Sequence, residues 1–393
     1  MSNQFKVPMS SPDLTDAERQ AVMAVLNTPD LSMGSRIDAF EQSICTFTGN
    51  KHAIGVSSGT AGLHLCVRAA DIKAGNYVIT TPFSFVASTN VLLFEQATPV
   101  FVDVDPVTGN IDPVLTAQAV DDLQKGGAAA RRWLPRKGAS EGGQLKALLV
   151  VDVFGQPAEL GALEQMAVQH KLRFIEDSCE ALGAEYKGKK AGTFGDFGVF
   201  AFYPNKQITT GEGGMIVTDD DEAARLMQAL RNQGRAPGDT WLQHTYLGYN
   251  YRMDEMSAVL GLTQMKRIEE LLNKRQQVAD WYNERLPEIP GVEEPKLVPS
   301  TTRVSWFVYV IRLAKGIDRA AVANRLHDQG IPVRPYFLPI HLQPYMVERF
   351  GYRPGDFPVT EDLGERGLAI PFSSKMTEEQ VEVVCQELRK SLR

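Results

Sequence analysis

Short apolar runs alternate with helical patterns through the first two thirds of this sequence, and this alternation restricts the fold more than any other feature. Most of the runs are apolar at successive positions, so both faces of the corresponding strands would be buried. Strands are predicted over residues 52–56, 76–80, 98–104, 146–154 and 173–177, and helices over 60–70, from 86 onwards and over 160–170. Strands separated by helices indicate an α/β fold with a mainly parallel central sheet flanked by helices.

Two segments depart from this alternation. The apolar runs Val199 to Phe202 and Met215 to Val217 are joined by a loop instead of a helix, which favours an antiparallel pair. Residues 125–144 are rich in Gly, Ala and Arg. Such a composition is typical of a surface loop, so we interpret this segment as an insert.

The chain has 393 residues, which favours one large and one smaller domain. A long helical pattern runs from Met253 to about Leu286 and ends at a stretch rich in Pro and Gly. The tail is predicted to contain a strand over 305–313, a helix over 319–329 and a closing helix from 377. We therefore expect a large α/β domain over 1–265 and a small C-terminal α+β domain over 266–393.

The composition disfavours several classes of protein. A formal net charge of −7 argues against a general binder of nucleic acid or of anionic membranes. No apolar stretch approaches the roughly 20 residues that a membrane-spanning helix needs, and the N-terminus does not resemble a signal peptide. The four cysteines form no CxxC pair and have no His at ligand spacing, so neither a disulfide framework nor a metal site is expected. We expect a cytoplasmic protein.

In a parallel sheet, ligands bind at the carboxyl ends of the strands. Ser58, Gly59 and Thr60 lie between a predicted strand and a predicted helix. The free N–H groups and the dipole of a helix N-terminus favour an anion there, and Gly59 permits close approach. An ordinary Ser or Thr helix cap would have the same sequence, and this alternative stays open.

Three more side chains follow predicted strands. Asp177 ends an apolar strand, so its carboxylate needs a cation or strong donors, unless it only caps the next helix. Phe85 lies in a strand-to-helix turn and could cover a flat ligand, unless it is part of the core. Lys206 follows the run Val199 to Phe202, where a solvated lysine at a hairpin tip is the alternative.

Together these side chains match the needs of pyridoxal 5′-phosphate (PLP). This cofactor requires a phosphate site, a carboxylate at its ring nitrogen, a platform for its ring and an amine that forms a Schiff base. The glycines of 192–198 are not spaced as in a dinucleotide-binding loop, and the sequence has no Walker A pattern. NAD and ATP are therefore disfavoured as cofactors.

Five motifs in the chain strengthen this interpretation. They read SSGTAGL, EDSCEALGA, FYPNKQITTGEGGMI, LGYNYRMDEMSAVLGLTQM and RPYFLPIHLQPY. In this order they resemble the DegT/StrS family of PLP-dependent nucleotide-sugar aminotransferases. The resemblance extends from LTDAERQAVMAVL to LAIPFSS, which is nearly the whole chain, and it implies the fold-type-I aminotransferase architecture.

The resemblance implies a role for individual residues. Lys206 would form the Schiff base and move protons, and Asp177 would pair with the ring nitrogen. Phosphate-binding roles are implied for Ser58, Gly59 and Thr60, ring stacking for Phe85, and proximity to the phenolic oxygen for Glu180. In this family the residue corresponding to Asn250 reaches the phosphate of the neighbouring subunit, which implies a homodimer with shared active sites.

Two further points concern the substrate and a departure from the family. Many members have Ser five residues before the lysine, whereas this chain has Ala201, so one phosphate contact is in doubt. The motif that contains Arg334, Tyr336 and His341 would line the sugar-nucleotide pocket. The alternatives are that Arg334 is a solvated arginine and that His341 is a structural histidine.

The resemblance implies transamination of a nucleotide-linked keto-sugar, a 4-keto or 3-keto 6-deoxy sugar, with L-glutamate as the amino donor. Such an enzyme would serve the biosynthesis of amino-sugar glycans or polysaccharides. One alternative is an aminotransferase that acts on a cyclitol or another non-nucleotide ketone. Another is a PLP-binding regulator without turnover. Such regulators usually need a fused DNA-binding module, which we do not expect here because the motifs begin near residue 12.

Overall fold

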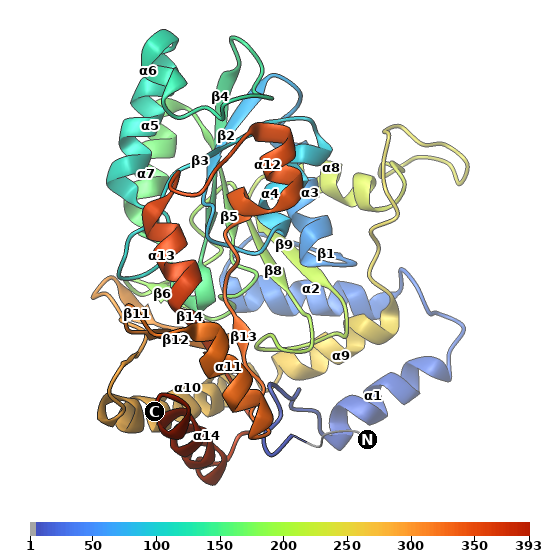
Figure 1. The fold of residues 1–393 in the computed structure, drawn as a ribbon. Coiled ribbons are helices and arrows are strands. Elements are labelled where there is room, and N and C mark those ends of the chain that lie inside the picture. The colour runs from blue at the N-terminus through green and yellow to red at the C-terminus, as the bar shows by residue number, and fades with distance from the viewer. Residues whose placement is uncertain (1–4) are drawn as a thin grey trace.

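A seven-stranded sheet lies at the centre of the computed structural model, which describes residues 5–393 (Figure 1). Its strands are β1 (His52–Val56), β2 (Asn76–Thr80), β3 (Thr98–Phe101), β4 (Gln144–Val151), β5 (Arg173–Asp177), β8 (Phe197–Ala201) and β9 (Gly214–Thr218). They are arranged in the order β1-β9-β8-β5-β4-β2-β3. The strands from β3 to β8 pair in parallel, and β9 pairs antiparallel with both β8 and β1. Both the mainly parallel sheet and the antiparallel pair are therefore confirmed.

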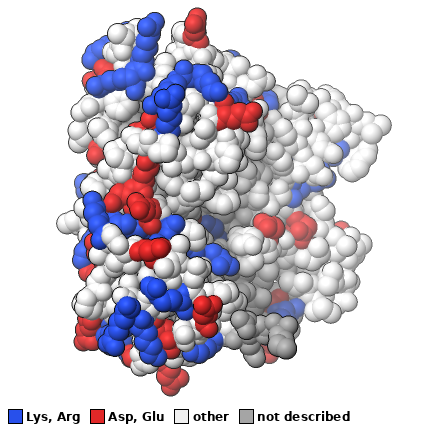
Figure 2. Space-filling model, in the orientation of Figure 1, with Lys and Arg blue, Asp and Glu red and all other residues white. Residues whose placement is uncertain are grey.

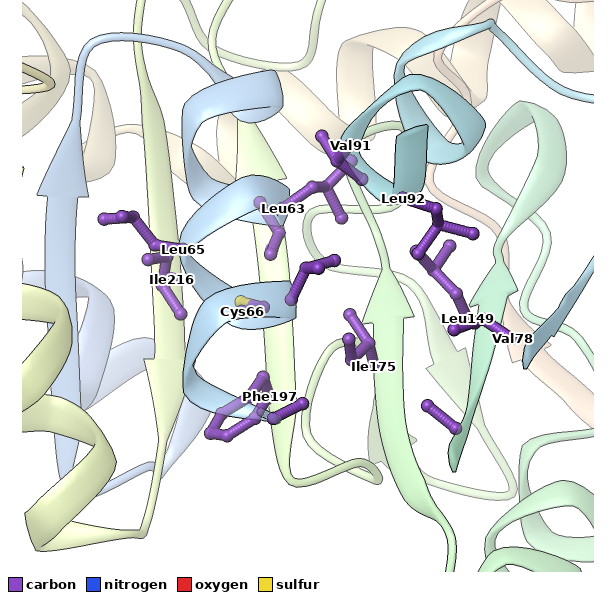
Figure 3. Packing of buried hydrophobic residues seen from close by; sticks show 14 of the residues in the cluster. Leu63, Leu65, Cys66, Val78, Val91, Leu92, Leu149, Ile175, Phe197 and Ile216 are labelled. Atoms are coloured by element: carbon purple, nitrogen blue, oxygen red, sulfur yellow. The ribbon is translucent and has the colours of Figure 1, made fainter. Parts of the chain in front are cut away.

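Helices cover both faces of this sheet. One face is packed by α3 (Gly59–Ala69), α4 (Ala87–Phe94) and α8 (Asp221–Arg231), and the other by α5 (Pro113–Lys125) and α7 (Leu160–His170). Successive residues of β4 point to opposite faces, so Leu149 belongs to one core and Leu148 to the other. Figure 3 shows Leu63 and Cys66 of α3 beside Ile175 of β5. This sandwich, which we call the large unit, fixes the first residues of α3 beside the ends of the strands.

The second core, which we call the small unit, is built on a four-stranded sheet below the large unit (Figure 1). This sheet consists of β10 (Val292–Glu293), β12 (Tyr309–Leu313), β14 (Gly367–Ile370) and β13 (Arg334–Pro335), in that order. The helices α11 (Arg319–Asp328) and α14 (Glu378–Ser391) pack on it. Val7 joins the same core from the other end of the chain. A small third sheet contains β11 (Thr301–Arg303), β6 (Glu185–Tyr186) and β7 (Lys189–Lys190).

Two elements cross the domain division that we expect at 265/266. Helix α10 (Ile268–Arg285) contributes Leu271 and Leu272 to the core beneath the large sheet, and Val278 and Tyr282 to the small unit. The segment with α12 (Pro344–Phe350) and α13 (Pro358–Arg366) packs back on the large unit, where Met346 and Phe101 share a cluster. The division of the chain into two domains stays a prediction, but the packing shows that the two cores interlock.

The long helical pattern predicted from Met253 to about Leu286 corresponds to two helices, α9 (Glu255–Met265) and α10, with a break between them. The break lies at Lys266 and Arg267. The guanidinium of Arg267 contacts Asp13 and Glu18, both at 3.2 Å, and so ties this turn to the N-terminal segment. The break lets α9 pack on α1 (Asp16–Leu26) and α2 (Ser35–Thr48) while α10 continues toward the small unit.

The insert over 125–144 is more ordered than a surface loop. It contains the short helix α6 (Gly127–Arg131), at the upper end of the molecule, where Figure 2 shows a group of Lys and Arg side chains. The indole Nε1 of Trp133 donates to Asp122 at 2.9 Å, and Arg136 pairs with Asp356 at 2.7 Å. These contacts anchor the middle of the segment to α5 and to the residues before α13. None of the helices within residues 5–393 combines the length and apolar character that crossing a bilayer requires.

Candidate active site

A cavity of about 590 Å³ opens at the carboxyl ends of the central strands. Residues at or just beyond the ends of β1, β2, β4, β5 and β8 line it, and the loop before β9 and the segment around β13 complete its wall. Its lining includes these residues singled out in the sequence: Ser58, Gly59, Thr60, Phe85, Asp177, Glu180, Ala201, Lys206 and Tyr336. The structure therefore brings together residues that come from five separate parts of the chain.

Lys206 lies in the loop between β8 and β9 and points into this cavity. Its side chain is only 12% exposed, so it is not a solvated lysine at a hairpin tip. Its Nζ atom lies 3.7 Å from Oε1 of Glu180 and 3.8 Å from the centroid of the Phe307 ring. An ammonium group over an aromatic face is attracted to it. The amine is thus held between a carboxylate and an aromatic ring.

Two carboxylates of the cavity wall, those of Asp177 and Glu180, are buried, whereas Glu212 is exposed. Asp177 is the last residue of β5, and its Oδ1 accepts the backbone N–H of Cys179 at 3.2 Å. Burial raises the pKa of Asp177, and the positive charge of Lys206 partly opposes this. Glu180 accepts the N–H of Phe154 at 2.9 Å, and burial likewise raises its pKa. The residues directly after Asp177 form turns and not a helix, so the helix-cap alternative for this residue is wrong. Each carboxylate would be stabilised by a cationic partner.

Helix α3 begins at the wall of the cavity. Ser58 is its N-cap, and the Ser58 hydroxyl accepts the N–H of Ala61 at 3.0 Å, as a helix cap does. The next position needs glycine, because a Cβ on Gly59 would lie 2.8 Å from the Cβ of Ala201 and 2.9 Å from Sγ of Cys179. The first N–H groups of α3 and its dipole make this end of the cavity favourable for an anion. Ala201 adjoins this helix start but offers no hydroxyl.

Phe85 lies on the loop between β2 and α4. It is 63% exposed although it belongs to the cavity wall, so it is not a core residue. A large exposed aromatic side chain beside an anion site provides an apolar face for a planar ligand.

The comparisons with known proteins agree with this geometry. The model of the DegT/DnrJ/EryC1/StrS aminotransferase family matches residues 12–389. The chain belongs to this family. It is 34% identical over 396 residues to the GDP-perosamine synthase of Caulobacter vibrioides, with both chains covered completely. It is 33% identical over 400 residues to the spore coat polysaccharide biosynthesis protein SpsC of Bacillus subtilis, covering 98% of this chain and 97% of SpsC.

Solved structures give the same result for the fold. The aminotransferase PseC of Helicobacter pylori, involved in the biosynthesis of pseudoaminic acid, is 29% identical and superimposes with a TM-score of 0.87. The match covers 98% of this chain and 99% of PseC. The fold-type-I architecture and the PLP dependence of this DegT/DnrJ/EryC1/StrS aminotransferase are thus confirmed. The cavity fits the cofactor chemically, since it combines an amine, two carboxylates, an exposed aromatic face and a helix N-terminus.

Three predicted site residues of the aminotransferase do not line this cavity within one chain. Asn250 is exposed and forms a β-bridge with Asn232. Arg334 is exposed on β13, and its guanidinium donates to the carbonyl of Val333 at 3.1 Å. His341 is completely buried, with its Nε2 3.0 Å from Glu361. This environment matches the structural alternative for His341, and a direct contact between His341 and a substrate in the cavity is incompatible with it.

Replacing His341 with glutamine is expected to make thermal stability less sensitive to acid. Burial lowers the pKa of His341, so on acidification the unfolded chain binds a proton near pH 6.5, before the folded chain does. The free energy of unfolding therefore falls as the pH decreases through this range, by up to about 1.4 kcal/mol per pH unit. Glutamine does not titrate, so His341→Gln lacks this loss.

The measurement is the Tm of both proteins between about pH 7.5 and pH 5.5. His64 is also buried with a lowered pKa, but it is present in both proteins, so its contribution cancels in the comparison. A Tm difference between the two proteins that stays constant over this pH range would contradict the prediction.

Several cavity residues of the aminotransferase were not recognised in the sequence. Phe307 contacts the amine of Lys206, and Cys179 and Leu338 also line the wall. The run 305–313 suggested one continuous strand, whereas β12 begins only at Tyr309. The residues before β12 cross to the large unit, and no local signal distinguishes Phe307 from an ordinary core residue.

Proposed function

We propose that this aminotransferase transfers the amino group of L-glutamate to a nucleotide-linked keto-sugar, a 4-keto or 3-keto 6-deoxy sugar, in the biosynthesis of amino-sugar glycans or polysaccharides. The observation that carries the proposal is the convergence of Lys206, Asp177, Glu180 and the start of α3 in one cavity. The full-length similarity to the GDP-perosamine synthase supports a nucleotide-linked acceptor. The similarity to SpsC supports a role in polysaccharide biosynthesis.

In this proposal Lys206 binds PLP covalently, and Asp177 pairs with its ring nitrogen. The start of α3, with Ser58, Gly59 and Thr60, binds the phosphate, Phe85 covers the ring, and Glu180 lies near the phenolic oxygen. Asp177 suits its role because burial disfavours its isolated charge, which a protonated ring nitrogen would stabilise.

PLP when bound supplies an electron sink that permits cleavage of the bond between the α-carbon of the donor and its proton. The chain supplies the proton transfer. We assign this to Nζ of Lys206, which, when it is free of the cofactor, would take up and return the proton of the substrate carbon. Glu180, 3.7 Å from this amine, can balance its positive charge. The walls formed by Phe85 and Tyr336 would limit the access of water to the reacting atoms.

The proposal includes a homodimer with shared active sites. The loop over residues 235–248 projects from the molecule on the right of Figure 1 and exposes Trp241, Leu242 and Leu247. Exposed apolar side chains on a projecting loop are typical of a protein–protein contact. Asn250 lies at the base of this loop with its side chain exposed, which is compatible with a contact to the phosphate in the partner subunit. We assign Arg334 and Tyr336 to acceptor binding.

The test begins with the purified full-length protein and L-glutamate. Glutamate should abolish the visible absorbance of the bond between PLP and lysine, and the correct keto-sugar nucleotide should restore it. A panel of keto-sugar nucleotides, with cyclitol ketones as matched controls, would be scored by the mass of the aminated product. Amination of a cyclitol alone would contradict the nucleotide-sugar acceptor. PLP bound without any half-reaction would contradict the assignment as an aminotransferase with these substrates.

A further inference from the structure

Arg275 of α10 is a buried cation close to the proposed attachment residue. It is 2% exposed, and its guanidinium is surrounded by main-chain carbonyl groups. Nη1 donates to the carbonyl oxygens of Trp306 at 3.1 Å and Phe307 at 3.2 Å. Nη2 donates to those of Asn205 at 3.1 Å and Lys206 at 2.6 Å. One side chain therefore joins the lysine loop of the large unit to the strand that enters the small unit.

Among residues 5–393 this guanidinium forms no salt bridge, and the carboxylate of Asp13, which is paired with Arg267 and Lys274, acts on it only at longer range. Burial lowers the pKa of Arg275 to about 10, which leaves it charged at neutral pH. A buried charge without an ionic partner is costly, and the carbonyl dipoles offset only part of that cost. An apolar residue would fill the same space without this penalty. The arrangement therefore suggests that Arg275 has a function that packing alone does not require.

The surroundings of Lys206 indicate what that function is. The guanidinium binds the main-chain carbonyl of Lys206 and also that of Phe307, whose ring lies 3.8 Å from Nζ of the same lysine. The next residue is fixed as well, because the side-chain amide of Gln207 donates to the carbonyls of Glu180 at 2.6 Å and Ser305 at 3.0 Å. The backbone on both sides of the lysine side chain is thus held against the segment 305–307.

We propose that Arg275 is a positioning residue, which locks the backbone of Lys206 to that of Phe307 so that Nζ is presented to the cofactor between the Phe307 ring and Glu180. The inference rests on the proposed role of Lys206 but not on the identity of the acceptor. Displacing a reacting group by about 1 Å can slow a reaction by about 100-fold. The loss of Arg275 should therefore slow the chemistry at Nζ while the phosphate end of the cavity stays intact.

The test separates covalent attachment from binding. In attachment, a C=N bond forms between Nζ and the aldehyde carbon of PLP, and the aldehyde oxygen leaves as water. Stopped-flow absorbance after addition of PLP to the full-length apoprotein measures this rate. Pyridoxine 5′-phosphate has no aldehyde, so its Kd reports the phosphate and ring sites alone. Borohydride reduction and peptide mapping confirm that the label is on Lys206.

For Arg275→Met we expect attachment to be at least about 10-fold slower, with the Kd of pyridoxine 5′-phosphate within about threefold of wild type. Arg275→Lys keeps the charge but cannot reach all four carbonyls, so its attachment rate should lie between those of wild type and Arg275→Met. The matched control is Arg319→Met, because Arg319 also donates only to carbonyls, but to those of Gly364 and Gly367 and not to the lysine loop. In this control the attachment rate and the Kd of pyridoxine 5′-phosphate should both stay within about twofold of wild type.

An unchanged attachment rate in Arg275→Met would overturn the inference. So would a parallel loss of affinity for pyridoxine 5′-phosphate, or an equal slowing in Arg319→Met, since each of these indicates a general structural effect. If Arg275→Met does not fold, the rate of Arg275→Lys decides, and a wild-type rate in that variant overturns the inference. If the wild-type protein itself carries no label on Lys206, the failure lies in the assignment of the lysine and not in the role of Arg275.

Discussion

Replacing Lys206 with alanine is expected to lower kcat by at least about four orders of magnitude, because the variant loses both the covalent attachment and the proton-transfer group. Alanine leaves the start of α3, Asp177 and Phe85 in place, so the variant should still bind PLP without a covalent bond. The measurements are steady-state turnover with the acceptor found in the panel, and borohydride labelling of the purified proteins.

The matched control is Lys315→Ala, since Lys315 is 81% exposed and lies in the small unit. This variant should retain wild-type turnover and labelling. Turnover above about one hundredth of wild type in Lys206→Ala would contradict the assignment, and so would a borohydride label on any other lysine.

Replacing Asp177 with asparagine should produce the second largest loss, about 10²- to 10³-fold in kcat. The side chains have the same shape, but asparagine has no negative charge to stabilise a protonated ring nitrogen, so the cofactor becomes a weaker electron sink. Lys206 and the helix start are unchanged, so PLP should still be attached. The absorbance of the bound cofactor measures attachment, and single-turnover rates with L-glutamate measure the proton transfer.

Asp196→Asn is the control. Asp177 ends strand β5 at the cavity, whereas the Asp196 carboxylate lies at the opposite end of β5, where it accepts the N–H of Phe174 at 2.7 Å. We expect that variant to keep a wild-type rate of proton transfer even if its Tm falls. A rate for Asp177→Asn within about threefold of wild type would show that the charge of Asp177 is not used.

The sequence predicted the parallel sheet and the strand-end residues because these depend on local patterns. An apolar run followed by a polar side chain marks the end of a strand, and the ends of parallel strands meet at one edge. Asp177 and Ser58 were located in this way, and both line the cavity. The roles of individual cavity residues, in contrast, came from the resemblance of motifs and stay predictions.

The contacts made by Phe307 and Arg275 could not be predicted from local patterns. Phe307 belongs to an apolar run. Whether its ring faces the core or the cavity depends on where the chain crosses between the two units. Arg275 lies in a helix in which a charged residue is ordinarily solvated, and only the packing of α10 on both cores encloses it. The break at Arg267 was missed for a related reason, because the contact with Asp13 joins residues that are far apart in sequence.

The wall of the cavity has a consequence for how the cell maintains this protein. Its residues extend from Ser58 to Gln343, so a chain that is still being synthesised, or that has lost one unit, has no complete place for the cofactor. A ligand that binds only the finished fold shifts the folding equilibrium toward it, by about 2.7 kcal/mol at 100 times its Kd. Without PLP, a larger fraction of this polypeptide is therefore expected to occupy open forms that proteases degrade.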